Sequence, residues 1–362
     1  MKRAIIAPFA AALIILLNGS ILGSAKTDQV FEPTYHLVRT PIRRIRAADT
    51  IHIDPGQTVK EWLPVALVPP ELDRQKNTSL HMLINGEEAQ LLHDDSPLHR
   101  PYLIADVWRE SRSFDATLVY EATLFRTELR PGPPRVPIKA LPPDRRTYYT
   151  SSTPAMDYNV PAFQTWKRSS GLGQHVGETD ITYAARVFAF VARNFGYRRF
   201  YGDVTASQVC QADDHKSHCG GLAVLFAATL RSEGKPARIL CGRYALSGSD
   251  EERRTRFFGA QVHVKAEVWI DGTGWIPVEV PAATDAPPET FWSYFGQDDG
   301  TFLTLHEDDN LKIVLGKYGV RTLTIAQVIQ IWTLPSSPKW IEGTKEDWTV
   351  SSLVVPESVV AP

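Results

Sequence analysis

Hydrophobic and polar residues alternate along several short stretches in the first third of the chain, which is the period of a β-strand with one buried face. Residues 50–53 and 117–127 show the alternation most clearly. Turn signals such as Pro55-Gly56 separate the stretches from one another. The pattern predicts a β-rich, sandwich-like N-terminal domain over residues 35–130.

A proline-rich segment follows this β-type region. Residues 131–143 contain six prolines and one glycine. Proline fixes its own φ angle and lacks a backbone N–H, so such a segment is stiff and cannot join a helix interior or a central strand. The pattern predicts an interdomain linker over residues 131–150.

The hydrophobic spacing changes to that of a helix after residue 155. Apolar side chains recur at intervals of three and four over residues 181–195 and 222–230. Short β-type runs follow at residues 237–241, 262–270 and 275–280. Two helices followed by a small antiparallel sheet predict an α+β core over residues 155–300. Further short strands, broken by Gly and Pro, predict a C-terminal β extension over residues 301–362.

The N-terminal 25 residues have the pattern of a signal peptide. Lys2 and Arg3 precede an almost wholly apolar stretch from residue 4 to residue 17, and residues 23–25 are small, as a signal peptidase requires. The apolar stretch is short for a membrane span, which needs about 20 residues. We therefore expect cleavage after Ala25, export to a periplasm or to the outside of the cell, and no stable membrane insertion of the mature protein.

Composition and charge narrow the class of protein. The chain has 362 residues, of which 43% are hydrophobic and 22% are charged, and these are the values of an ordinary globular protein. The formal net charge of −2 gives no attraction to nucleic acid or to an anionic membrane, so we expect neither as a partner.

Three cysteines, Cys210, Cys219 and Cys241, remain in the expected exported protein. The odd number means that at least one of them lies outside any internal disulfide. Cys210 and Cys241 could pair with each other, or both could be buried thiols, and the sequence leaves both arrangements open.

Cys219 stands at the predicted start of a helix. A thiol there lies close to unpaired backbone N–H groups and to the positive end of the helix dipole. Both favour the thiolate, which is the nucleophilic form of cysteine. Cys219 is therefore our candidate nucleophile.

A histidine and an acid follow at hairpin spacing. His263 comes eight residues before the turn signal at Asp271, and Glu279 comes eight residues after it. A hairpin that turns there brings the two side chains roughly opposite each other, whereas a slip of one residue would send Glu279 to the other face. Alternation in 262–270 places His263, Lys265, Glu267 and Trp269 on one strand face. We expect Glu267 to be structural, in an ion pair with Lys265 or Arg238.

Thiol, imidazole and carboxylate in this order suggest a Cys–His–acid triad of Cys219, His263 and Glu279. The surrounding residues resemble the transglutaminase-like family. His218-Cys219-Gly220-Gly221 and residues 230–238 are similar to the nucleophile helix of that family and the strand that follows it. Residues 263–268 and 274–279 are similar to the hairpin that carries the family's histidine and acid. The upstream helix through residues 194–197 also fits. The resemblance covers residues 155–300 well and is weaker to about residue 345, while Trp62-Leu63-Pro64 is only loosely similar to β domains that precede such cores.

The resemblance implies a papain-like α+β core and acyl chemistry on peptide amides, with a protein or peptide substrate and no cofactor or metal. Two residues depart from the family pattern. Glu279 stands where the family usually has Asp, and Val264-Lys265 stands where a Trp usually follows the His. The longer glutamate requires a shifted backbone.

We expect a cysteine protease or amidase rather than a crosslinking acyltransferase, because water is always available as the acceptor. The backbone N–H of Cys219 is our candidate for an oxyanion hole, with Gln208 or Gln211 as weaker candidates.

Two other interpretations compete with this one. Cys210, His215, His218 and Cys219 supply two sulfurs and two imidazoles within ten residues, which are ligand types of a structural zinc site. Their spacing is not a common zinc pattern. The second alternative is a catalytically inactive core that serves as a binding module of the cell envelope.

Overall fold

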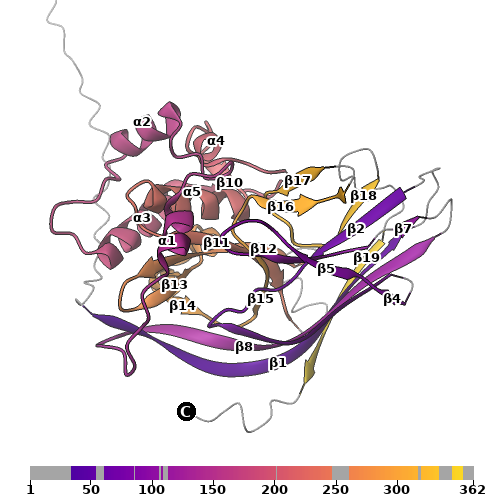
Figure 1. Cartoon of the computed structure of the whole chain (residues 1–362). Coiled ribbons are helices and arrows are strands. Elements are labelled where there is room, and N and C mark those ends of the chain that lie inside the picture. Colours follow the sequence, from indigo (N-terminus) through magenta and orange to yellow (C-terminus); the bar gives the residue numbers. More distant parts are fainter. Residues whose placement is uncertain are drawn as a thin grey trace, which may run out of the picture. The chain divides into compact units, whose positions relative to one another are not determined.

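The computed structural model combines helices with mainly antiparallel sheets (Figure 1). It describes residues 34–53, 61–84, 86–105, 107–108, 113–200, 202–246, 261–316, 319–333 and 345–353. The predicted signal peptide, residues 1–25, lies outside the described residues. Among the residues described, no helix is long and apolar enough to cross a bilayer.

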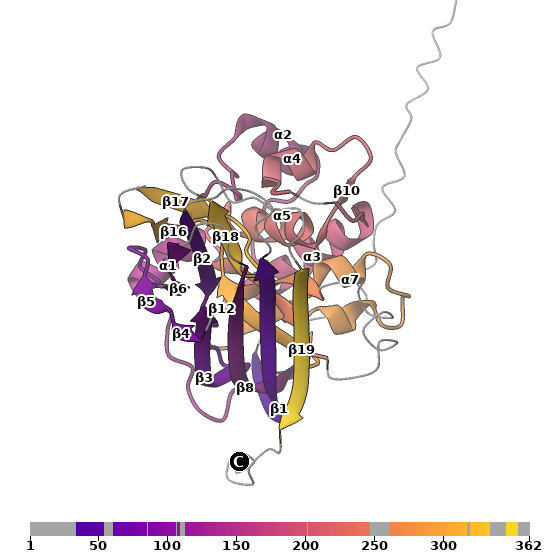
Figure 2. The ribbon, with the colours of Figure 1, turned by 90° about the vertical axis from the view of Figure 1, so that its right-hand side faces the viewer.

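Two long antiparallel strands, β1 (Tyr35–Ile53) and β8 (Phe114–Pro131), form the centre of the largest sheet. Figure 2 shows β19, β1, β8 and β3 side by side. The other strands of this sheet are β3 (Gln75–Ile84), β4 (Glu87–Glu88), β14 (Gln297–Asp298) and β19 (Lys345–Leu353). Buried residues alternate with less buried ones over much of β8, as the sequence pattern predicts.

A second sheet packs against the first. It contains β2 (Glu61–Leu67), β5 (Gln90–His93), β6 (Pro101–Ile104), β7 (Val107–Trp108) and β18 (Gln330–Thr333). Ile45 and Leu118 of the first sheet share one buried cluster with Trp62 and Leu103 of the second, which makes the pair a sandwich. A hairpin of β16 (Leu311–Val314) and β17 (Val320–Leu323) adds a smaller cluster beside β2 and β6.

Another sheet includes the strand that carries His263. Its order is β13 (Gly274–Val278), β12 (Val262–Ile270), β11 (Ala237–Tyr244) and β15 (Phe302–Glu307). The helices are α1 (Pro143–Thr150), α2 (Pro161–Ser169), α3 (Asp180–Asn194), α4 (Ala206–Cys210), α5 (Cys219–Arg231), α7 (Val280–Ala283) and the 3₁₀ helix η1 (Phe291–Tyr294). A short parallel pair joins β9 (Gly196–Tyr197) to β10 (Lys216–Ser217).

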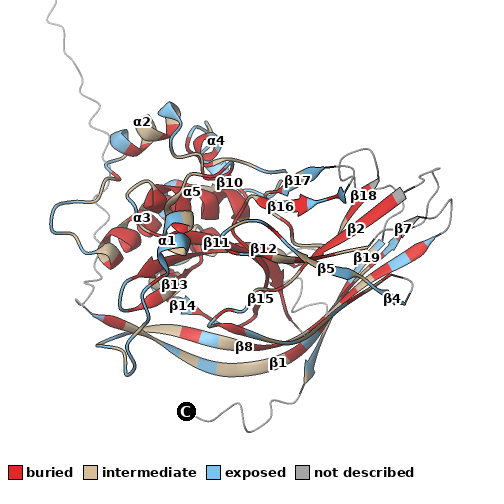
Figure 3. Cartoon of the chain, viewed as in Figure 1, coloured by how far each residue is buried: buried red, intermediate tan, exposed pale blue. Residues whose placement is uncertain are grey.

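Helix α5 packs directly on β11 and β12 and is buried along almost its whole length (Figure 3). Its apolar side chains meet Val264, Ala266 and Val268 of β12 in a common cluster.

These helices and antiparallel strands confirm the predicted α+β class. Both predicted helices are present, and Thr179 caps α3, because its side chain accepts the Thr182 N–H.

The predicted domain division, with domains at 35–130, 155–300 and 301–362, stays a prediction. Residues 132–142 form neither helix nor strand, while α1 occupies residues 143–150 of the predicted linker. Two strands from the C-terminal part return to the N-terminal sheets. Strand β19 pairs with β1, and β18 pairs with β2.

One buried arginine joins several of these elements. Arg231, at the end of α5, donates through Nη2 to both carboxylate oxygens of Asp308, each at 2.7 Å. Its Nε donates to the carbonyl of Ala237 and its Nη1 to the carbonyl of Ser151. Both charged side chains are fully buried. The α5 end is thereby fixed to the start of β11 and to the turn after β15.

We predict that Arg231→Leu lowers the free energy of unfolding by about 3–5 kcal/mol, because it leaves the Asp308 carboxylate buried without its partner. Denaturant unfolding measures the loss. Arg39→Leu is the matched control, since its partner Asp73 is 67% exposed, and we expect a loss below about 1 kcal/mol. An equal loss in both variants would contradict the prediction.

Candidate active site

Cys219 is the first residue of α5, and His218 is the cap of that helix. His218 has an extended backbone, and its Nδ1 accepts the N–H of Gly221 at 3.2 Å. Its Nε2 lies 2.9 Å from the carbonyl oxygen of Gly202. Since Nδ1 accepts this N–H, Nε2 is the ring nitrogen that donates to Gly202. His218 therefore fixes the helix start beneath the thiol.

Two glycines after Cys219 permit close packing around this helix start. A Cβ on Gly221 would lie 2.1 Å from Oγ of Ser217, and a Cβ on Gly220 would lie 2.6 Å from Cδ1 of Ile325. Neither position has room for a side chain. The Cys219-Gly220-Gly221 sequence thus lets the nucleophile helix begin between β10 and the segment that carries Ile325.

His263 on β12 and Glu279 after β13 are hydrogen-bonded. The Nε2–H of His263 donates to Oε1 of Glu279 at 2.7 Å, and both side chains are buried. The predicted hairpin register is wrong by two residues, because Ala266 pairs with Val278, so that in this register residue 265 faces residue 279. A shift of two keeps the same strand face, and Glu279 reaches His263 diagonally.

The Cys219 thiol shares a hydrogen bond with the same imidazole. Since Glu279 occupies Nε2, the nitrogen that remains for the thiol is Nδ1. Burial opposes ionisation of Cys219, but hydrogen bonds and nearby imidazoles outweigh it and lower its pKa to about 6. Both His218 and His263 contribute to this lowering through hydrogen bonds and through their charges.

The pKa of His263 moves in the opposite direction. Burial favours the neutral ring, but the charge of Glu279 and the hydrogen bonds to Cys219 and Glu279 raise its pKa to about 9. Between these two pKa values the pair is a thiolate and an imidazolium. The arrangement can thus present a nucleophile and a proton donor at neutral pH.

Residues from distant parts of the chain complete the surroundings of His263. The Tyr244 ring lies 5.2 Å from the imidazole, and Phe302 meets it edge-on at 6.2 Å. Gln327 donates through Nε2 to the backbone carbonyl of His263 at 2.5 Å and to that of Gly242 at 3.3 Å. Sequence reasoning missed Gln327 and Ile325, because no local pattern connects the segment between β17 and β18 to the nucleophile.

Within the described residues, the backbone N–H groups of Cys219 and Gly220 donate to no other atom. This leaves the predicted Cys219 N–H available to a bound oxyanion. The two weaker candidates serve other roles. Gln208 accepts the Thr205 N–H in the capping box of α4, and Gln211 is the exposed C-cap of that helix.

All three cysteines are free thiols. Cys210 is buried and its Sγ hydrogen-bonds to the Ser207 carbonyl, while burial and the charge of Asp157 raise its pKa to about 12. Cys241 is fully buried in β11. The four residues of the alternative zinc site do not form a cluster of three or more potential ligands, nor does any such cluster occur in the described part of the chain.

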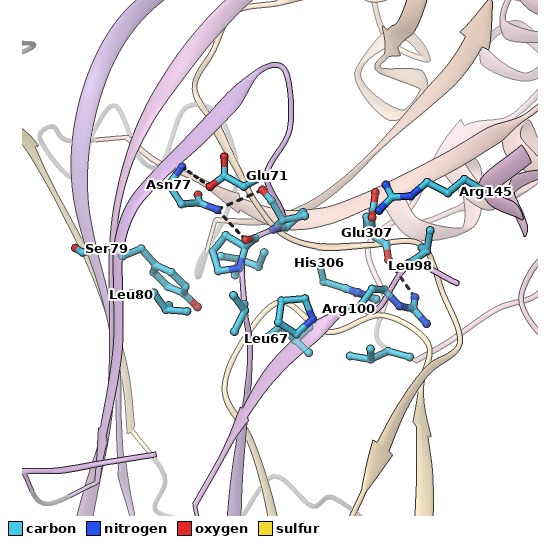
Figure 4. Close-up of a pocket in the computed structure, with 17 residues that line it drawn as sticks. Leu67, Glu71, Asn77, Ser79, Leu80, Leu98, Arg100, Arg145, His306 and Glu307 are labelled. Carbon is cyan, nitrogen blue, oxygen red and sulfur yellow. Dashed lines mark hydrogen bonds between the residues drawn. The ribbon is translucent and has the colours of Figure 1, made fainter. Parts of the chain in front are cut away.

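A cavity of about 730 Å³ lies beside the acid of the triad, and Tyr244, Lys265, Glu279 and Asp298 line part of it. Another cavity, of about 390 Å³, contains none of the three predicted catalytic residues (Figure 4). Leu80 lies on one side of it and Leu98 on the other. Of these two cavities, the larger is therefore the one that Glu279 lines, and neither is lined by Cys219 or His263.

Part of the chain is similar to a known protein family. Residues 171–280 match the family model of the transglutaminase-like superfamily, and this range includes Cys219, His263 and Glu279. A search of curated proteins finds no match. The catalytic role of the three residues stays a prediction, because none of these comparisons tests it.

One solved structure has a similar fold at low sequence identity. A candidate cysteine protease from Cytophaga hutchinsonii aligns with a TM-score of 0.53 and 13% identity, over 88% of this chain and 94% of that chain. The periplasmic domain of TgpA from Pseudomonas aeruginosa aligns with a TM-score of only 0.33 and 13% identity, over 72% of this chain and 97% of that one, so no argument rests on it. Residues 171–280, which include the nucleophile helix α5 and the hairpin of β12 and β13, are therefore similar to the transglutaminase-like superfamily.

Proposed function

We propose that this protein is an exported cysteine-dependent hydrolase that cleaves peptide or isopeptide amides through Cys219, His263 and Glu279. The observation that carries the proposal is the continuous set of hydrogen bonds from the Cys219 thiol through His263 to Glu279 at the start of a capped helix. Export is supported by the signal-peptide pattern of residues 1–25.

The reaction follows from the positions of these groups. The Cys219 thiolate attacks the amide carbon, and the carbonyl electrons move to an oxyanion that the Cys219 N–H can bind. When the C–N bond breaks, the amine leaves with the proton of the His263 imidazolium. Neutral His263 then removes a proton from water, which attacks the thioester and releases the acid and the thiolate. His263 is again an imidazolium at the end of the cycle.

Water is our proposed acceptor rather than a second amine. Water is present at high concentration and competes with any amine for the thioester.

We predict that Cys219→Ala and His263→Ala each lower amide or activated-ester turnover by at least about 10³-fold, because each removes a member of one catalytic unit. Thermal melts check that both variants remain folded. Cys210→Ala is the matched control, and we expect its turnover to stay near that of the wild type. Unchanged turnover in Cys219→Ala would contradict the mechanism and favour the binding module.

We predict a bell-shaped pH dependence of kcat/KM with limbs near pH 6 and pH 9. Activity falls below the lower value, because the Cys219 thiolate gains a proton, and above the higher one, because the His263 imidazolium loses its proton. Independently, the rate of iodoacetamide labelling of Cys219 is expected to reach half its maximum near pH 6. A midpoint near 8.5, that of an ordinary thiol, would show that no ion pair forms.

We predict that Glu279→Asp lowers kcat/KM by about 10²-fold, although it keeps the charge. Glu279 reaches His263 diagonally, and a side chain one methylene shorter misplaces the carboxylate by about 1 Å. Steady-state kinetics on the folded variant measures the loss. Activity equal to that of the wild type would mean that the charge, and not the reach, is what matters.

A further inference from the structure

The face of β12 that carries His263 is buried against charged groups rather than against an apolar layer. His263, Lys265 and Glu267 are each less than 7% exposed. The groups that meet them come from other elements: Arg238 from β11, Arg74 from the turn before β3, and Asp298 from β14. We call the set of Arg74, Arg238, His263, Lys265, Glu267, Glu279, Asp298 and Glu307 the buried charge layer.

Lys265 links the acid of the triad to the rest of this layer. Its Nζ donates to Oδ2 of Asp298 at 2.8 Å and lies 3.5 Å from Oε2 of Glu279. That oxygen of Glu279 is buried and makes no hydrogen bond within the described residues. The ammonium of Lys265 is thus the charge that faces the carboxylate oxygen not held by His263.

Asp298 is held in turn by Arg74, whose Nη1 lies 3.2 Å from the same Oδ2 atom. Arg74 also lies 3.6 Å from Glu267, and Arg238 binds Glu267 and Glu307 at 2.6 Å each. The layer therefore contains three permanent cations and four carboxylates. Protonation of His263 brings its formal charge to zero.

We propose that Lys265 is a positioning residue for Glu279, and that Asp298 and Arg74 hold its ammonium in place, so that the layer keeps the Glu279 carboxylate directed at His263. This inference rests on the proposed function and deepens it, because it assigns the support of the acid to named residues.

Other groups around Lys265 do not replace it. The Tyr244 and Phe302 rings lie 5.6 and 5.2 Å from Nζ. On the cavity side the lining includes Arg126, Glu128 and Asp299, and Asp299 binds Thr301 through Oδ1. The charged groups in direct contact with Lys265 are Asp298 and Glu279.

Removal of the ammonium alone would leave Glu279 and Asp298 buried together with one cation fewer. Burial and a neighbouring like charge both raise the pKa of a carboxyl group. Glu279 would then lose the cation that faces its second carboxylate oxygen and would stabilise the imidazolium less. The thiol of Cys219 would regain its proton as a result.

The test is the pH profile of iodoacetamide labelling at Cys219, with the modified peptide identified. We expect Lys265→Met to slow labelling at pH 7 by about tenfold relative to the wild type. The double variant Lys265→Met/Asp298→Asn removes one charge of each sign, so we expect labelling within about threefold of the wild type. Lys312→Met removes an exposed lysine of β16 and is the matched control, with no expected change.

The outcomes separate the roles of Lys265. An unchanged profile in Lys265→Met overturns the proposal, and slow labelling that Asp298→Asn does not restore shows a packing role and also overturns it. If thermal melts show that Lys265→Met is unfolded, Arg74→Met replaces it, with an expected slowing of about threefold, and no change there is equally decisive against the proposal.

Labelling does not depend on amide turnover. A wild type that labels as a low-pKa thiol but cleaves no amide would refute the proposed function and leave the role of Lys265 intact. A normal labelling profile in the wild type would refute the ion pair of Cys219 and His263, and with it both proposals.

Discussion

Strand β12 is buried on both faces, and the positions of the elements around it depend on the contacts that each face makes. Val264, Ala266 and Val268 pack against α5, which fixes the distance from the strand to the helix that carries Cys219. The opposite face carries charges, and each has a partner of opposite sign from another strand or turn. A strand satisfied in this way cannot slide along its neighbours without separating ions in a medium of low dielectric constant.

The buried charge layer costs desolvation energy, and an apolar layer of the same volume would give a stability that is similar or greater. What the charges add is orientation. His263 is held through Nε2 by Glu279 and is flanked by the Tyr244 ring, so the imidazole has little freedom to turn away from the thiol. A site whose dipoles and charges are oriented before the substrate arrives does not spend activation energy on that orientation.

Local sequence patterns predicted the elements near the site well. The alternation over 262–270 placed His263 and Glu267 on one face, and the expected ion pair of Glu267 is confirmed with Arg238. The hairpin register was wrong, because the turn between Ile270 and Gly274 lies one residue beyond the assumed centre, and symmetry about a turn shifts every pair by two. The shift was harmless for the face, since the strand period is also two.

Contacts between residues far apart in the sequence could not be predicted from any local pattern. In the sequence, His218 and Cys219 look like two adjacent metal ligands followed by glycines. Only the structure shows that His218 caps the helix by accepting the Gly221 N–H. Asp298 lies 33 residues from Lys265, and Gln327 lies 64 residues from His263. Nothing in the spacing of these residues selects them over other polar residues at similar distances.

The return of the C-terminal strands has a consequence for the order of events during synthesis. β1 lacks its neighbour β19 until residues 345–353 have been made, and the carbonyl of His263 lacks its Gln327 donor until the ribosome has passed residue 327. A nascent chain that ends before residue 327 therefore lacks this contact to His263. Contacts between residues so far apart in sequence also form slowly. The contacts around His263 are therefore complete only once residue 327 is in place.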